Sequence, residues 1–432
     1  MRILKKKSEI STFLELLKKR AAGVGPGIEK AVRAILADVK KKGDSSVENY
    51  TRRFDRHGLP LKIKPGEIRK YAAKAEKQYI KALEISAARI RSFHEKQKER
   101  SWSYKVDGEV LGQIIRPLER VGVYVPGGKA SYPSTVLMNV IPAQVAGVNE
   151  IALCVPFPGG EINPYVMAAT ELLGVKEVYR IGGAQAIGAM AFGTRILRKV
   201  DKIVGPGNIY VALAKKMVYG EVAIDMIAGP SEILIIADET ANPVFVAADM
   251  LSQAEHDEFA SSILITDSES LVSEVALEIG KQAMCLKRKQ IAEKSLKQFG
   301  AMIVTKDIRT AAAIANSVAP EHLEIMTEQP EKTLDLIHNA GAVFLGLWTP
   351  EALGDYAAGP NHTLPTGGTA RFSSPLGVYD FIKRTSILQF NRKSFMLISD
   401  TVEAIAGIEG LEAHANTVRI RRTALKKQRK PE

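Results

Sequence analysis

From about residue 120 to residue 346 the sequence alternates short apolar runs with stretches of helical periodicity, and this alternation limits the possible folds more than any other feature. Strands separated by helices require a parallel sheet that is covered on both faces. Because so many runs occur, we expect two such sheets, divided near residues 238–242. The runs are 121–125, 151–155, 177–181, 201–205, 232–238, 262–266, 301–305 and 342–346.

The flanking regions are predicted to be helical. Residues 28–55 and 66–97 carry apolar side chains at three- and four-residue spacing, which is typical of amphipathic helices. The pattern becomes helical again after about residue 370. We therefore expect an α/β fold with two doubly wound, Rossmann-like parallel-sheet lobes and helical N- and C-terminal arms. The expected divisions are an N-terminal helical arm (1–24), a helical segment that joins the second lobe (25–118), the first lobe (119–238), the second lobe (239–375) and a C-terminal arm with a basic tail (376–432).

Charge and cysteine content exclude several classes of protein. The net charge is +12, but the segment 419–432 alone contributes seven basic residues and one acidic residue. A solvated tail explains this charge better than nucleic-acid binding, which remains a secondary possibility for the tail. The chain has no apolar run long enough to span a membrane and no secretory signal, so the cytoplasm is the expected compartment. Cys154 and Cys285 form neither a disulfide framework nor a cysteine metal site.

Three of the predicted strands run into glycine-rich turns, at 125–134, 181–190 and 204–216. Ligands of open α/β sheets bind beyond the carboxyl ends of the strands, where glycine lets a phosphate approach the backbone. None of the turns is a GxGxxG motif. Nucleotide binding and ordinary tight turns both remain open.

The polar residues at element boundaries are the candidates for chemistry. Gln253 and His256 are three residues apart near a helix end, so they share one face. Other histidines near acids, glycine or proline are His322, His362 and His414, whereas His57, His94 and His338 are expected to be ordinary surface or interface residues.

The segment 319-APEHLEI-325 is predicted to begin a helix at Pro320. The positive end of the helix dipole would then keep Glu321 ionised and His322 neutral, which suits a base near pH 7. The alternative is an acid that only stabilises the helix. His256, His414 and an acid near residue 355 could also bind zinc. The residues alone therefore suggest metal-assisted alcohol oxidation or hydrolysis.

Taken together and in order, these segments resemble the histidinol dehydrogenase family. The resemblance runs from about residue 25 to residue 420. It is carried by 121-VGVYVPGGKASYPSTVLMNVIPAQVAGV-148, 181-IGGAQAIGAMAFGT-194, 203-IVGPGNIYVALAK-215, 228-AGPSEILIIAD-238, 249-DMLSQAEHD-257, 319-APEHLE-324, 354-GDYAAGPNHTLPTGGTARFSSPLGV-378 and 409-EGLEAHA-415.

The resemblance implies a zinc- and NAD-dependent oxidation of L-histidinol to L-histidine through bound L-histidinaldehyde, the last step of histidine biosynthesis. It makes 119–238 the NAD-binding lobe, 239–375 the zinc and substrate lobe, and 376–432 the arm of an intertwined homodimer. One Zn²⁺ per subunit would be bound by Gln253, His256, Asp355 and His414.

The resemblance also implies roles for the remaining residues. Glu321 and His322 would be catalytic, and Tyr124, Gln185 and Asn208 would contact NAD. Ser231, His322, His362 and Glu409 would bind the substrate together with the metal ligands, with Glu409 and His414 reaching the site from the second subunit. The alternatives are a zinc and NAD dehydrogenase of the same fold that acts on another amino alcohol or diol, and a zinc hydrolase, which would leave the NAD residues without a role.

Overall fold

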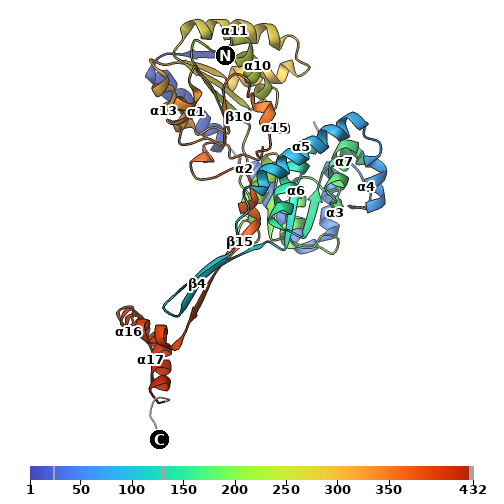
Figure 1. Ribbon diagram of the computed structural model, residues 1–432. Coiled ribbons are helices and arrows are strands. Elements are labelled where there is room, and N and C mark those ends of the chain that lie inside the picture. The colour runs from blue at the N-terminus through green and yellow to red at the C-terminus, as the bar shows by residue number, and fades with distance from the viewer. Residues whose placement is uncertain (23–24, 128–131, 428–432) are drawn as a thin grey trace. The chain divides into compact units, whose positions relative to one another are not determined.

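The computed structural model describes residues 1–22, 25–127 and 132–427 (Figure 1). The chain divides into two compact units, Met1–Lys98 with Leu118–Phe381 and Glu99–Pro117 with Ile382–Glu432. No helix among the described residues is long and apolar enough to cross a membrane.

The first unit contains two α/β lobes, and the first lobe is built on a sheet with the strand order β2-β7-β6-β5-β8-β9. All neighbouring strands are parallel except β2, which pairs antiparallel with β7. The strands are β2 (Lys62–Ile63), β5 (Arg120–Tyr124), β6 (Glu150–Cys154), β7 (Glu177–Tyr179), β8 (Lys202–Val204) and β9 (Ala223–Ile224).

Both faces of this sheet are buried, which explains the continuous apolar runs of its strands. Val121 and Val123 pack into the core of one face and Tyr124 into the core of the other. The first face is covered by α4 (Pro65–Ala72), α5 (Lys77–Glu95), α6 (Pro133–Ala146) and α7 (Pro164–Leu172), and the second by α2 (Pro26–Lys42), α3 (Asp44–Phe54), α8 (Gly183–Phe192) and α9 (Ile209–Val218).

The second lobe has a wholly parallel sheet with the order β1-β12-β11-β10-β13-β14. Its strands are β1 (Arg2–Leu4), β10 (Glu232–Ala237), β11 (Ser261–Thr266), β12 (Ala301–Val304), β13 (His322–Met326) and β14 (Ala342–Leu345). One core lies under α10 (Pro243–Ala254), α11 (Glu269–Ala283) and α12 (Lys289–Phe299), and the other lies under α1 (Lys7–Ala22), α13 (Ile308–Val318) and α14 (Pro330–Leu334). The two parallel sheets confirm the predicted fold class. The predicted division near residues 238–242 was wrong, because β10 belongs to the second sheet. The helices of 25–118, which we expected to join the second lobe, cover the first sheet instead.

Short elements complete the first unit. They are the helix α15 (Glu351–Tyr356) and the 3-10 turns η1 (Pro158–Gly160), η2 (Thr369–Arg371) and η3 (Val378–Phe381). Residues 2–4, which we expected to belong to a helical arm, form the edge strand β1 beside β12. Burial of Leu4 in the core of the sheet overrides the local helical preference.

The second unit contains an antiparallel sheet of the order β15-β4-β3, followed by the helices α16 (Arg392–Ile408) and α17 (Glu412–Lys427). The strands are β3 (Trp102–Val106), β4 (Glu109–Pro117) and β15 (Ile382–Phe390). The sequence patterns had indicated helix in these regions, and that expectation was wrong for the three strands. Asp107 and Gly108 both have positive φ, at 49° and 88°, and form the two-residue hairpin turn that an Asp-Gly pair favours.

Candidate active site

The sequence suggested that Glu321 and His322 begin a helix, but His322 is instead the first residue of the strand β13, which lies between β10 and β14. Ala319, with φ of 52°, ends α13 in the left-handed region, and the chain then enters the sheet between β10 and β14. The apolar run after His322 is buried on both faces, and this burial favours a strand over a helix. Both side chains thus lie at the beginning of a buried strand.

One backbone hydrogen bond sets the orientation of His322. Its Nδ1 lies 2.9 Å from the carbonyl oxygen of Glu232, so Nδ1–H donates and the neutral ring carries its lone pair on Nε2. Nε2 lies 3.6 Å from Asp355 Oδ1 and 3.7 Å from Glu351 Oε1. Within the described part of the chain Nε2 has no hydrogen-bond partner. The basic atom of the ring therefore faces a pair of carboxylates.

The carboxylates around His322 favour a positive charge at this place. Burial opposes the charged form of His322, but the surrounding carboxylates of Glu321, Asp355 and Glu351 raise its pKa to about 10. Burial raises the pKa of Glu321 to about 8. Burial opposes ionisation of Asp355 as well, yet its contact with His322 lowers its pKa to about 2. A bound cation would meet the same demand for positive charge.

Three side chains could bind a metal ion. Ligand atoms of His256, Glu351 and Asp355 lie within 4.8 Å of one another. Glu351 and Asp355 are four residues apart on α15, so they share one face. Glu324 in β13 anchors this helix, because its Oε1 accepts a hydrogen bond of 2.7 Å from the Glu351 N–H. We had not predicted Glu351, although its four-residue spacing from Asp355 after Pro350 was a usable signal.

Gln253 supplies a second reason to expect a cation. It lies in the last turn of α10, and His256 follows just beyond the helix end. Gln253 is completely buried, and neither polar atom of its amide has a hydrogen-bond partner among the described residues. A buried amide without a partner is unfavourable unless a ligand satisfies it. A histidine nitrogen, carboxylates and an amide oxygen together fit a divalent cation such as zinc.

The predicted substrate residues are divided between the two units. In the first unit, His362 Nδ1 lies 3.1 Å from the backbone oxygen of Asp355, and Ser231 directly precedes β10. Glu409 follows α16 and His414 lies on α17, both exposed and both in the second unit. The cluster of the first unit is thus formed without Glu409 and His414.

The residues predicted to contact NAD lie beyond the carboxyl ends of β5, β7 and β8 in the first sheet. The hydroxyl of Tyr124 accepts a hydrogen bond of 3.1 Å from Gly183 N–H. Gln185 is buried, and both of its amide atoms lack a partner in the described residues. Asn208 caps α9 by accepting hydrogen bonds from Tyr210 and Val211 N–H. These carboxyl ends form the edge at which an open α/β sheet binds its ligand, although residues 128–131 of the first glycine turn lie outside the described residues.

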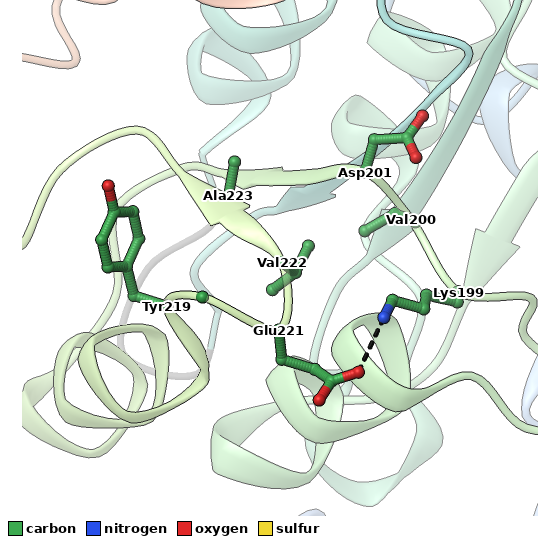
Figure 2. A pocket seen from close by; sticks show the side chains of 8 residues that line it. Lys199, Val200, Asp201, Tyr219, Glu221, Val222 and Ala223 are labelled. Atoms are coloured by element: carbon green, nitrogen blue, oxygen red, sulfur yellow. Dashed lines mark hydrogen bonds and ion pairs between the residues drawn. The ribbon is translucent and has the colours of Figure 1, made fainter. Parts of the chain in front are cut away.

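A surface hollow of about 550 Å³ lies at the opposite edge of the same sheet (Figure 2). Residues 199–201 and 219–223 line it, just before β8 and β9 begin. An ion pair of 2.7 Å between Lys199 and Glu221 crosses it. The lining includes none of the candidate site residues, so this hollow does not belong to the candidate site.

Two histidines that we had expected at the surface or an interface are buried instead. His94 is fully buried, and its Nδ1 lies 2.8 Å from the Ile90 carbonyl oxygen within α5. His57 is also buried, and burial lowers its pKa. His338 is exposed, as expected.

Fold and site define a class of protein with two α/β lobes, in which a buried histidine faces carboxylates that could bind a cation. Comparison with known proteins narrows this class. The family model for histidinol dehydrogenase matches residues 18–422. The chain therefore belongs to the histidinol dehydrogenase family.

Individual relatives agree with this assignment over nearly the whole chain. A histidinol dehydrogenase of Aquifex aeolicus is 54% identical over 417 residues, which cover 96% of this chain and 97% of the relative. One of Geobacter sulfurreducens is 52% identical, with 93% and 95% of the two chains covered. The crystal structure of histidinol dehydrogenase from Elizabethkingia anophelis has a TM-score of 0.93 at 40% identity and covers 99% of each chain.

Proposed function

We propose that this protein oxidises L-histidinol to L-histidine through bound L-histidinaldehyde and reduces two NAD⁺ in succession, as the last step of histidine biosynthesis. The observation that carries the proposal is the buried His322, whose unpartnered Nε2 faces a cluster of metal-binding side chains. Such an arrangement places a base beside an alcohol held on a metal ion.

Zinc would be held by Gln253, His256 and Asp355 of one subunit, together with His414. When bound, it would orient the substrate and polarise the oxygen at the reacting carbon. Glu351 lies close enough to His256 and Asp355 to act as a further ligand or to orient the others. Ser231, His362 and Glu409 would bind the rest of the substrate.

The two catalytic residues would act at different steps. In the metal-free cluster the neighbouring carboxylates keep His322 protonated. With their charge neutralised by a bound cation the ring would be neutral, and Nε2 would accept the hydroxyl proton of the alcohol because the Glu232 carbonyl occupies Nδ1. Glu321 Oε2 accepts a hydrogen bond of 2.9 Å from Glu232 N–H, which leaves the other carboxylate oxygen to take a proton from the water that adds to the aldehyde. Tyr124, Gln185 and Asn208 would bind NAD.

The stoichiometry of the reaction tests this proposal. We expect two NADH per L-histidinol consumed, and no turnover after a chelator has removed the metal. One NADH per molecule of a different amino alcohol, with none from L-histidinol, would identify a relative with another substrate. A complete lack of NADH formation with all alcohols would contradict dehydrogenase activity.

We further propose that the second unit binds a second copy of the chain in a homodimer. Its sheet and helices expose large apolar side chains, as interaction surfaces do. Exposed fractions are 54% for Trp102, 70% for Leu388, 68% for Leu397 and 88% for Ile408. In such a dimer Glu409 and His414 of the partner would complete each site.

Mixing two inactive variants tests this exchange. His322→Asn damages the site in the first unit, and His414→Asn damages the arm. If the arm acts on the partner, a mixed dimer has one site with both residues intact, so random reassociation should restore about a quarter of the wild-type activity. The measurement is NADH formation after the two variants are unfolded and refolded together. If activity returned only on mixing with wild-type protein, each arm would serve its own subunit.

A further inference from the structure

The first lobe contains a buried ion pair that the proposed reaction does not use. Lys215 lies on α9, and Asp225 directly follows β9. The side chains contact each other and are 2% and 0% exposed. Replacing a buried ion pair by apolar residues is often neutral for stability. Stability alone therefore does not account for this pair, and its hydrogen bonds show what it holds in place.

The ion pair holds one peptide segment from both sides. The N–H of Gly205 donates a hydrogen bond of 2.8 Å to Asp225 Oδ2. The carbonyl oxygen of Gly205 accepts a hydrogen bond of 2.8 Å from Lys215 Nζ. Asp225 Oδ1 is engaged by the N–H of Met226 at 2.6 Å. Both polar groups of Gly205 are thus fixed by charged side chains in a dry environment, where hydrogen bonds are strong.

Gly205 lies against the end of β5, among the turns that are predicted to bind the nucleotide. Its φ is +108°, and a Cβ at this position would overlap the backbone oxygen of Tyr124. Only glycine allows this approach. Tyr124 in turn accepts the N–H of Gly183, and Asn208 lies three residues after Gly205. One anchored glycine therefore links the turns that carry Tyr124, Gln185 and Asn208.

We propose that Lys215 and Asp225 are positioning residues for the nucleotide, which fix Gly205 against Tyr124 and so set the spacing of the nucleotide-binding turns. The inference rests on the proposed binding of NAD at this edge. On this proposal the ion pair supports the affinity for NAD. The affinity for L-histidinol, which is proposed to bind at the second lobe, should not change.

Double variants test the proposal, because a single substitution would leave an unpaired buried charge and could prevent folding. The apolar double variant, Lys215→Met with Asp225→Leu, removes both anchors and both charges. The amide double variant, Lys215→Met with Asp225→Asn, removes the charges but keeps an oxygen that can accept the Gly205 N–H. We expect the KM for NAD⁺ to rise about tenfold or more in the apolar double variant, since a turn that adopts the binding geometry only about a tenth of the time weakens the apparent affinity by that factor. The rise should be smaller in the amide double variant, because its retained oxygen restores part of the affinity. The KM for L-histidinol should change less than about twofold in both.

The matched control is also a double variant, Arg120→Met with Glu177→Gln, so that it too removes both charges of an ion pair. Arg120 is a buried partner of Glu177 and Glu150 at the start of β5, at the edge of the sheet away from the glycine turns. This control variant should have a lower unfolding temperature and an unchanged KM for NAD⁺. An unchanged KM for NAD⁺ in the apolar double variant would overturn the proposal. If that protein does not fold, an unchanged KM in the amide double variant would overturn it equally.

Gln185→Ala separates this inference from the proposed function. Because the Gln185 amide has no partner among the described residues, its removal breaks no hydrogen bond there and tests the ligand contact; the unfolding temperature shows separately what the lost packing costs. If Gln185→Ala raises the KM for NAD⁺ and the double variants of Lys215 and Asp225 do not, the positioning role alone is wrong. If Gln185→Ala also has no effect, the proposed NAD edge is wrong.

Discussion

Replacing His322 by asparagine should lower the rate of both half-reactions by ~10²–10⁴-fold, the usual cost of losing a general base. Asparagine can still donate to the Glu232 carbonyl that now binds Nδ1, so the fold around β13 should persist. The assay supplies L-histidinol and L-histidinaldehyde separately and follows NADH in single turnovers. An undiminished rate with L-histidinol would remove His322 from the reaction.

Glu321→Gln is the informative contrast to this variant. Glutamine keeps an oxygen for the Glu232 N–H that Glu321 binds, but it cannot take a proton from water. We expect aldehyde oxidation to fall by a similar ~10²–10⁴-fold and alcohol oxidation to fall much less.

The pH dependence of the rate provides a second test of the role of Glu321. Burial raises the pKa of Glu321 to about 8, so the carboxylate needed as a base accumulates only as the pH rises through that value. The contribution of Glu321 to aldehyde oxidation in the wild type should therefore increase as the pH rises through about 8, and the glutamine variant should lose this part of the pH dependence. Equal losses in both half-reactions would leave Glu321 as an orienting residue.

The second large effect is expected from Asp355→Asn. The substitution preserves the shape of the side chain but removes the charge that contacts His322 and lies beside His256. We expect bound zinc to be lost and turnover to fall by more than about 100-fold, since even residues that only support a ligand cost up to that factor. Metal content by atomic absorption and NADH formation are the two measurements.

Glu331→Gln, at an exposed position of α14, is the control for removing one negative charge from this lobe. It should retain both metal and activity. An Asp355→Asn protein with full metal content and normal turnover would show that Asp355 is not a ligand.

The parallel sheets were predictable because strands buried on both faces produce apolar runs that the sequence displays directly. The β3–β4 hairpin was missed, although the Asp107-Gly108 pair is typical of a two-residue hairpin turn. The beginning of β13 was missed for a different reason. Pro320 and Glu321 are locally typical of a helix start, and only the neighbouring strands β10 and β14 decide the outcome.

The candidate site was predictable in part. Resemblance to the family supplied His256, Asp355 and His322, which the structure places in one cluster. Glu351 was missed although its four-residue spacing from Asp355 was a usable signal; its place in the cluster also depends on the contact of α15 with Glu324, which is distant in the sequence. The burial of His94 could not be foreseen either, since it depends on packing around Asn361, far away in the sequence. The assignments of Tyr124, Gln185, Asn208, Glu409 and His414 stay predictions.

The strand pairing of the second unit has a consequence for synthesis of the chain. Pro117 in β4 pairs with Ile382 in β15, so β4 leaves the ribosome long before its neighbour exists. At ~5–20 residues per second the delay is on the order of tens of seconds. During this time the β3–β4 hairpin, with its exposed Trp102 and Tyr104, has an open edge that can pair with other nascent chains. Newly made protein should therefore depend on chaperones until β15, in about the last eighth of the chain, has been translated.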